Sequence, residues 1–437
     1  MRVAVVGAGW AGCAAAVALA ERGCAVTVFE AAAVPGGRAR RVVRDGLPLD
    51  NGQHLLLGAY EQVRAQLALV HGGDGERGLL ARTPLAVVPA GEGFAMRARH
   101  LPAPFGLAAG LLRARGMSFA DRLATARWFA RLRAGGFRVT PGTTVAQLCA
   151  SGPRAAERAL WGPLCLAALN TAPERACAQV FANVLRAAFA ADGGASDYLI
   201  AATDLTALYP EAALRLVAAR GGSVRLRTAA RVAAIADDGV SLEVAGSRER
   251  HDAVVVAVGP HQLASAIGDV PALAHAAAAA AQLGYEPIAT AWLGYGAPVA
   301  LPARIARLDD APGQWAFDRP DVLARAAPDA SRPALAQLVS VVISASGPHD
   351  ALAAPELGAA CDAQLRRLLP GLPPLAWSQA IVERRATYAC TPHRARAPSL
   401  LPHPRAALAG DWIDAEYPAT LEAAVRSGLA AARALAA

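Results

Sequence analysis

A set of glycines with the spacing of a phosphate-binding loop lies near the start of the chain: Gly7, Gly9 and Gly12. An apolar run at 3–6 precedes them, and a second apolar run at 25–29 follows and ends on Glu30. In such a loop the first glycine permits a tight turn, the second lets the backbone approach a pyrophosphate, and the third lets helix and strand pack closely. The helix start adds free N–H groups and a positive dipole end. The pattern predicts a βαβ unit that binds a dinucleotide, with Glu30 accepting hydrogen bonds from the adenosine ribose.

Further glycine and polar motifs, at both ends of the chain, are typical of flavin contacts. Two glycines at 36–37 permit close approach of the backbone, and Arg38 can neutralise phosphate charge. The polar run 50–54 follows between apolar neighbours. Near the other end, a short apolar run leads to a Gly-Asp pair at 410–411, and a helix-like stretch begins near 421. The acid can bind the ribityl or phosphate region, and the helix start can face the flavin edge where negative charge develops on reduction.

Several longer stretches resemble one protein family: 7–12, 36–40, 49–60, 160–171, 179–181, 385–387, 410–412 and 418–422. Through them the chain resembles the superfamily of FAD-dependent amine oxidases and isoprenoid desaturases. Within it, the chain is most similar to the hydroxysqualene dehydroxylases of bacterial hopanoid synthesis, also called squalene-associated FAD-dependent desaturases. The cofactor motifs are shared across the superfamily, whereas 50–60 and 160–171 point to this family. Cys13 departs from the pattern, because a larger apolar residue is expected there, and should affect local packing only.

The resemblance implies a fold and a set of cofactor contacts. The expected fold is α/β, with a discontinuous Rossmann-like FAD-binding domain and an α+β substrate domain. Val232 resembles the position whose backbone contacts adenine in this superfamily. The residues expected to bind FAD are Gly7, Gly9, Trp10, Ala11, Gly12, Glu30, Gly36, Gly37, Arg38, Gln53, His54, Val232, Gly410, Asp411, Thr420 and Leu421.

The resemblance also implies a reaction, the reductive removal of the hydroxyl of hydroxysqualene to give squalene. The allylic hydroxyl would leave as water with the help of a general acid, and hydride from the reduced flavin would quench the cation. The acid should lie in an apolar pocket that raises its pKa. His54 is the first choice and Asp204 the second, although His54 can equally order its turn and Asp204 can cap a helix. Tyr388 could reach the flavin face.

Two other functions fit parts of the pattern. An isoprenoid desaturase of the carotenoid type would run the redox chemistry in the opposite direction. A non-enzymatic prenyl-lipid-binding protein could share the fold without flavin chemistry, but the intact motifs at 36–38 and 410–411 argue against it. Some apolar side chains at helical spacing should either line a tunnel for a long isoprenoid substrate or pack in the core: Leu164, Leu166, Val180, Phe181, Val184 and Leu185.

Composition excludes several classes of site. All 43 basic residues are arginines, so neither a lysine Schiff base nor the lysine-held water expected of amine oxidases can form. The seven cysteines are scattered without a C-x-x-C pair, which indicates reduced thiols in a cytoplasmic protein rather than disulfides or a metal site. The net charge of +8 is modest and no nucleic-acid motif is present, so we expect no nucleic-acid partner. An unidentified electron donor must reduce the flavin.

The positions of the cofactor motifs predict the domain organisation. The FAD domain should comprise 1–95, 210–268 and 401–437, and the substrate domain 96–209, mostly helical, and 269–400. In the middle cofactor piece, a helix is expected at 211–220. Strands are expected at 223–226, 230–235, 240–244, 253–258, 288–293 and 335–343.

The segment 101–138 carries seven arginines against one acid, Asp121, with aromatic and leucine side chains interleaved. A basic amphipathic segment can lie on an anionic membrane surface, and a long hydrocarbon substrate is drawn from a bilayer. The alternative is a solvated helix packed on the core. The uncharged stretch 3–20 lacks the basic n-region of a secretory signal. We therefore expect a cytoplasmic protein that contacts the inner face of the cytoplasmic membrane peripherally.

Overall fold

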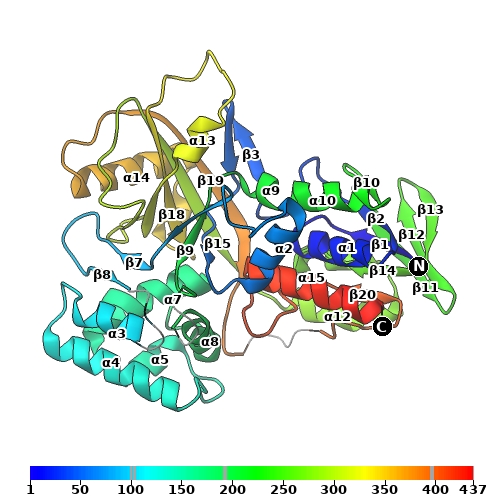
Figure 1. Cartoon of the computed structure of the whole chain (residues 1–437), viewed down its shortest axis with the longest axis horizontal. Helices are drawn as coiled ribbons and strands as arrows, with labels where there is room; N and C mark the ends of the chain where they lie inside the picture. The colour runs from blue at the N-terminus through cyan, green and yellow to red at the C-terminus, as the bar shows by residue number, and fades with distance from the viewer. Residues whose placement is uncertain (99–100, 102–104, 190–193, 394–397, 437) are drawn as a thin grey trace.

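The computed structural model describes every residue except 99–100, 102–104, 190–193, 394–397 and 437. Its elements form three regions (Figure 1): a parallel sheet wrapped by helices, with both chain termini; an antiparallel sheet beside α14 (Ala354–Leu368); and a group of helices from α3 (Phe105–Leu112) to α8 (Ala178–Phe189). The fold is α/β, with a Rossmann-like cofactor domain built from separate segments of the chain.

The first region is built on a five-stranded sheet in the order β10-β2-β1-β14-β20, in which all neighbours are parallel. Its strands are β1 (Arg2–Val6), β2 (Ala25–Phe29), β10 (Ser223–Arg225), β14 (Ala253–Val256) and β20 (Ala406–Leu408). Val3 and Val5 of β1 face a layer of helices, whereas Ala4 and Val6 face the opposite layer. This burial on both faces explains why the strands are continuously apolar.

Two layers cover the sheet. The first consists of α1 (Trp10–Glu21), α2 (Glu61–His71), α9 (Leu205–Leu208), α10 (Pro210–Ala219) and α15 (Leu421–Leu435), and α1 packs against both α10 and α15. The second consists of the antiparallel strands β11 (Ala230–Ala236), β12 (Gly239–Val244) and β13 (Ser247–His251), with α11 (Pro260–Ile267) and α12 (Pro271–Ala281). β13 was not expected, because its charged sequence has no apolar alternation and its backbone pairing with β12 defines it.

The second region is an antiparallel sheet in the order β16-β17-β18-β15-β19. Its strands are β15 (Tyr285–Tyr295), β16 (Ile305–Arg307), β17 (Trp315–Asp318), β18 (Gln337–Ser344) and β19 (Leu375–Tyr388). α14 packs on β15 and β19, and the short α13 (Pro320–Ala324) contacts β18. A 3₁₀ turn, Pro348–Ala351, precedes α14. The two long strands β15 and β19 run from this region toward the cofactor domain (Figure 1).

The third region is helical, as the sequence predicts. Besides α3 and α8 it contains α4 (Phe119–Ala134), α5 (Val145–Cys149), α6 (Arg154–Ala156), a π-helical turn (Glu157–Trp161) and α7 (Gly162–Leu169). Trp128, Phe129 and Trp161 form the aromatic centre of its core, with ring centroids 5.2 Å apart between the two tryptophans. No helix of the described chain is long and apolar enough to cross a membrane.

Short strand pairs join the regions. They are β3 (Arg41–Arg44) with β4 (Leu47–Asp50), β5 (Leu56–Leu57) and β6 (Leu80–Thr83) with β9 (Tyr198–Ala201), and β7 (Ala86–Val87) with β8 (Met96–Arg97). The expected boundary after residue 95 falls inside the β7–β8 pair, whose Val87 and Met96 pack in the core of the helical region. Backbone pairing thus interlaces the cofactor and substrate regions more closely than motif positions alone indicate.

Candidate active site

The glycine loop between β1 and α1 combines one tight contact with one open face. Gly7 has a φ of +102°, a conformation that other residues rarely adopt. A Cβ atom on Gly12 would overlap the carbonyl oxygen of Gly7, so α1 can approach β1 only with glycine there. A Cβ on Gly9 would meet nothing within 4 Å. The backbone at Gly9 therefore faces open space at a helix start, which fits the pyrophosphate of a dinucleotide.

The side chains that open α1 point away from that space. Trp10 and Ala11 are buried in the core, so it is their backbone N–H groups that remain for a ligand. The Trp10 indole N–H donates to the carbonyl of Ala39 at 3.2 Å, and the N–H of Gly36 donates to the carbonyl of Ala8 at 2.8 Å. The second glycine motif, Gly36 and Gly37, thus lies directly against the first.

Glu30 joins the end of β2 to the same loop. Its carboxylate accepts the backbone N–H groups of Ala8 at 2.7 Å and Ala32 at 2.8 Å. A carboxylate at this position suits the hydroxyl groups of an adenosine ribose and disfavours a 2′-phosphate.

Two predicted cofactor residues from opposite ends of the chain form an ion pair. Arg38 Nη2 lies 2.5 Å from Asp411 Oδ1, and Arg38 Nη1 donates to the carbonyl of Ala386 at 2.8 Å. Asp411 follows Gly410, whose N–H donates to Ser427 Oγ at 2.9 Å. The N-terminal segment, β19 and the C-terminal segment therefore converge at one place.

Tyr388 links β19 to the C-terminal loop by hydrogen bonds, but it does not line the large cavity described below. Its side chain is fully buried, and its hydroxyl donates to the carbonyl of Asp411 at 2.5 Å and accepts the N–H of Ala419 at 2.6 Å. The structure thus places Tyr388 behind the C-terminal loop, where it orders the backbone between β20 and α15.

The start of α15 faces the convergence and is tied to α2. Thr420 caps α15 by accepting the N–H of Ala423 at 3.0 Å, and Leu421 begins the helix. The Glu422 carboxylate accepts the N–H groups of Gln62 and Val63, both at 3.0 Å, and so caps the start of α2. Burial raises the pKa of Glu422, and these N–H donors oppose that rise.

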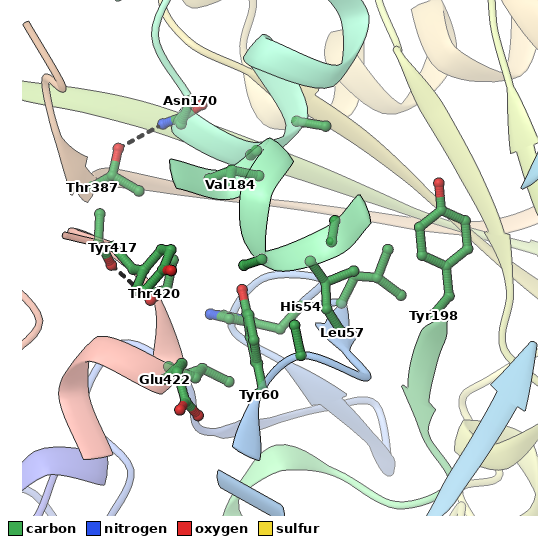
Figure 2. A pocket seen from close by; sticks show the side chains of 18 of the residues that line it. His54, Leu57, Tyr60, Asn170, Val184, Tyr198, Thr387, Tyr417, Thr420 and Glu422 are labelled. Atoms are coloured by element: carbon green, nitrogen blue, oxygen red, sulfur yellow. Dashed lines mark hydrogen bonds between the residues drawn. The ribbon is translucent and has the colours of Figure 1, made fainter. Parts of the chain in front are cut away.

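A large cavity of about 1430 Å³ extends from these residues into the substrate region. Its near end is polar and includes Arg38, the turn 52–54, Thr420 and Glu422. Its far end is apolar, with walls from the helical region and from the antiparallel sheet: Leu160, Pro163, Leu164, Val184, Phe189, Ile288, Ile305, Trp315, Phe317 and Val342. Figure 2 shows His54, Tyr60 and Thr420 around the polar end.

Sequence periodicity identified the helices of this wall but not their inward faces. Leu164 and Val184 line the cavity. Leu166 is half-buried outside it, whereas the remaining three candidates pack in the helical core: Val180, Phe181 and Leu185.

The turn 50–54 is held by a buried arginine that directly follows β17 of the antiparallel sheet. Arg319, only 1% exposed, donates from Nη1 to Gln53 Oε1 at 2.6 Å and from Nη2 to Asp50 Oδ2 at 3.2 Å. Asp321 accepts from Arg319 at 2.8 and 2.9 Å, and Gln53 Nε2 donates to the carbonyl of His54 at 3.0 Å. Burial nevertheless raises the pKa of Asp50 to about 6, against the attraction of Arg319.

His54 lies at the polar end of the cavity in a state that favours the neutral ring. Its Nδ1 is 2.8 Å from the carbonyl oxygen of Gly52. A carbonyl can only accept, so Nδ1 carries the proton and, in the neutral ring, Nε2 is an acceptor. Burial lowers the pKa of His54, and the nearby charge of Arg38 lowers it further against the opposing Gly52 contact.

Asp204 is a helix cap outside the cavity. Its Oδ1 accepts the N–H of Ala207 at 2.9 Å at the start of α9, and its Oδ2 pairs with Arg41 at 3.3 Å and Arg325 at 2.8 Å. The capping alternative therefore describes its position, and no cavity-lining atom comes from Asp204.

Val232 lies on β11 with its side chain buried in the core beneath the parallel sheet. The register between β11 and β12 shifts just after it, between 232 and 234. Its contact with adenine stays a prediction.

Sequence reasoning missed three residues of the site: Arg319, Tyr60 and Glu422. Arg319 stands in the run 318–321, in which three of the four residues are charged and which lies between apolar neighbours. Charge is unusual in such a place, so this run was a signal of the site that the sequence offered. Tyr60 is the one aromatic side chain of the motif 49–60. Across the described residues, no group of His, Cys, Asp and Glu is arranged to hold a metal ion.

Comparison with known proteins places the chain in a family. The family of flavin-containing amine oxidoreductases matches residues 10–436. The hydroxysqualene dehydroxylase of Rhodopseudomonas palustris is 32% identical over 98% of this chain and 97% of its own length. The hydroxyneurosporene desaturase of Rubrivivax gelatinosus is 55% identical over only 12% of this chain and 10% of its own length.

An oxidoreductase from Methanosarcina mazei has the same fold, with a TM-score of 0.71 at 15% identity over 98% of this chain and 99% of that one. The family match begins at Trp10, within the glycine loop, and includes the α15 start, and the geometry of both fits a flavin dinucleotide. The chain therefore belongs to the flavin-containing amine oxidoreductase family and is an FAD-dependent oxidoreductase.

Proposed function

We propose that this enzyme reductively removes the hydroxyl group of hydroxysqualene to give squalene. The name of the Rhodopseudomonas palustris relative supports the substrate, because the two chains match over nearly their whole lengths. The observation on this chain that carries the proposal is the cavity, which joins the polar cofactor residues to an apolar wall within about 1430 Å³. Such a cavity suits a long hydrocarbon with a single polar group.

FAD would lie along a path from the glycine loop to the start of α15. The backbone at Gly9 would face the pyrophosphate, Glu30 the adenosine ribose, and the Arg38–Asp411 pair the ribityl or phosphate region. When bound and reduced, FAD supplies the hydride that replaces the departing hydroxyl.

The flavin ring would lie between the turn 52–54 and the α15 start. Gln53 and His54 would lie beside the ring, and Thr420 and Leu421 would direct the positive end of the helix dipole at its pyrimidine edge. The apolar wall would exclude water and so protect a substrate cation from capture. His54 is a poor proton donor in its neutral state, so we assign it a hydrogen-bonding role.

Product analysis tests the function. Anaerobic holoenzyme reduced with dithionite, which replaces the unidentified electron donor, should convert hydroxysqualene to squalene and regain the absorbance of oxidised flavin. Mass spectrometry of the extracted lipid identifies the product. Gly9→Val is the matched control, because its side chain would fill the space assigned to the pyrophosphate and leave the protein without flavin.

A carotenoid-type desaturase is the second candidate, supported by the short match to the Rubrivivax gelatinosus protein. Such an enzyme would need oxidised flavin and would leave reduced flavin unchanged in the presence of hydroxysqualene. Absence of both squalene and flavin re-oxidation would therefore reject the dehydroxylase proposal.

We also propose that the enzyme takes its substrate from an anionic membrane surface. Four exposed apolar side chains lie within residues 101–119: Leu101, Phe105, Leu112 and Phe119. Phe105 and Phe119 are 63% and 62% exposed, and the exposed Arg113 and Arg115 lie between them. Apolar side chains beside cations are the combination that binds anionic bilayers. The part of this segment at 102–104 lies outside the described residues.

Vesicle flotation tests this contact. Binding to anionic vesicles should fall as salt screens the arginines, and Phe105→Ser with Phe119→Ser should weaken it at every salt concentration. Leu352→Ser is the control, because Leu352 is also exposed but lies in another region. Equal recovery with neutral and anionic vesicles at all salt concentrations would leave α4 as a helix that only packs on the core.

A further inference from the structure

Tyr60 brings a hydroxyl without a protein partner to the polar end of the cavity. It immediately precedes α2 and lines the cavity, and no described residue forms a hydrogen bond with its hydroxyl. Burial raises the pKa of Tyr60, and the charge of Glu422 raises it further, so the hydroxyl keeps its proton. Tyr60 can therefore act as a hydrogen-bond donor to a ligand.

His54 brings the complementary acceptor to the same space. The contact with the Gly52 carbonyl places the ring proton on Nδ1, and Nε2 forms no hydrogen bond with a described residue. In Figure 2 the His54 and Tyr60 side chains enter one space, with Leu57 on one side and Thr420 on the other.

Several neighbouring polar groups already have partners within the protein. Asn170 Nδ2 donates to Thr387 Oγ1 at 3.0 Å, and Thr420 Oγ1 donates to the carbonyl of Tyr417 at 2.8 Å, as Figure 2 shows. The Glu422 oxygens accept two N–H groups of α2. Tyr60 and His54 thus supply one donor and one acceptor from the same segment, six residues apart in sequence.

We propose that Tyr60 and His54 together form a recognition site for the hydroxyl group of an isoprenoid alcohol. Tyr60 donates to the substrate oxygen, and the substrate hydroxyl donates to Nε2 of His54, because an alcohol needs one partner of each kind. This inference rests on the proposed function and names what selects its substrate. The hydrocarbon product would leave both groups without partners, so it binds less tightly than the alcohol and is released.

Binding measurements on the oxidised holoenzyme test the pair without turnover. The dissociation constants of hydroxysqualene and squalene are measured from the change in flavin absorbance, and their ratio gives the preference for the alcohol. We expect the wild-type enzyme to prefer the alcohol. Tyr60→Phe should reduce this preference about tenfold, the value of one hydrogen bond of about 1.4 kcal/mol.

Three comparisons make the test specific. His54→Phe should reduce the preference to a similar extent, and the double variant should lose less than the sum of the two, because both groups contact one hydroxyl. Tyr198→Phe is the matched control: Tyr198 also lines the cavity, but its side chain points away from His54 in Figure 2, and the preference should persist. Flavin content and circular dichroism confirm that each variant is folded.

The outcomes separate this inference from the proposed function. An unchanged preference in Tyr60→Phe, or an equal loss in Tyr198→Phe, would overturn the recognition pair even if squalene is formed. A preference for the alcohol that depends on Tyr60 and His54, in an enzyme that yields no squalene, would support the pair and reject the dehydroxylase. If Tyr60→Phe fails to fold, the His54→Phe and Tyr198→Phe ratios still decide.

Discussion

The glycine loop 7–12 and the turn 50–54 both face the proposed flavin, yet they are held in different ways. The loop is held by backbone geometry, since a Cβ on Gly12 would overlap the Gly7 carbonyl. The turn is held by side chains, above all by Arg319, which lies 266 residues from Gln53 in the sequence. The loop therefore depends on residues within it, whereas the turn depends on a distant charged side chain.

The difference determines where each site is vulnerable. Apart from Glu30, which accepts the N–H of Ala8, few side chains support the loop, so most other substitutions outside the glycines should leave it in place. The turn instead depends on the buried ion pair of Arg319 with Asp50. If Arg319 were lost, the charge of Asp50 would be buried without a partner.

Arg319→Met should have the largest effect on stability. It leaves Asp50 buried without its cation and leaves Asp321 paired with Arg325 alone, which should lower the free energy of unfolding by about 3–5 kcal/mol. Denaturant unfolding measures the change. Adding Asp50→Asn should restore part of the loss, because it removes the charge that was left without a partner.

Arg231→Met is the control for that substitution. Arg231 pairs with Glu243 at 2.5 Å on the surface, where both side chains are nearly half exposed. Exposed pairs contribute little, so its unfolding curve should overlay that of the wild type. An equally small effect for Arg319→Met would mean that the buried pair does not hold the turn.

The pH dependence of stability distinguishes the glycine loop from the turn 50–54. The glycines of the loop carry no titratable group, whereas the turn contains Asp50. Burial raises the pKa of Asp50 from 3.8 to about 6, so the folded protein holds this proton more tightly than the unfolded chain. Its contribution, up to about 3 kcal/mol, is complete below pH ~4 and is lost as the pH rises through ~6. The difference in unfolding free energy between wild type and Asp50→Asn should therefore shift in favour of the wild type on acidification. A difference that is constant between pH 4 and 7 would show that Asp50 titrates normally.

Gly12→Ala should have the smallest of the three effects on stability, about 2 kcal/mol, since overpacking forces α1 away from β1. Gly9→Ala provides the comparison, because its methyl group would enter open space and should leave the unfolding midpoint unchanged. Thermal unfolding of the flavin-free proteins measures both. Equal destabilisation by the two substitutions would contradict the described loop.

Sequence patterns predicted the backbone-determined parts of the molecule well. β1 and β2 lie within one residue of the apolar runs 3–6 and 25–29, because apolar patterning and glycine spacing are local properties. β13 was missed, since the pairing that defines it involves another strand and leaves no local pattern.

The arrangement of side chains was harder to predict from the sequence than the backbone. Asp204 is polar and lies in a family-like stretch, but its partners Arg41 and Arg325 come from elsewhere in the chain. Similarly, no local pattern shows that Leu164 faces a cavity while Leu185 packs in the core. Which polar groups retain a free donor or acceptor, as Tyr60 does, depends on every neighbour and emerges only from three-dimensional structure.

The ion pair between Arg38 and Asp411 has a consequence for synthesis of the protein in the cell. The two residues are separated by 373 positions, and at roughly 5–20 residues per second a ribosome needs about 20–75 s to deliver the second after the first. Until β14 and β20 emerge, the β1 edge has no neighbour on one side and is open to association with other chains. A nascent chain can thus display the glycine loop well before the residues that complete its cofactor pocket have been made.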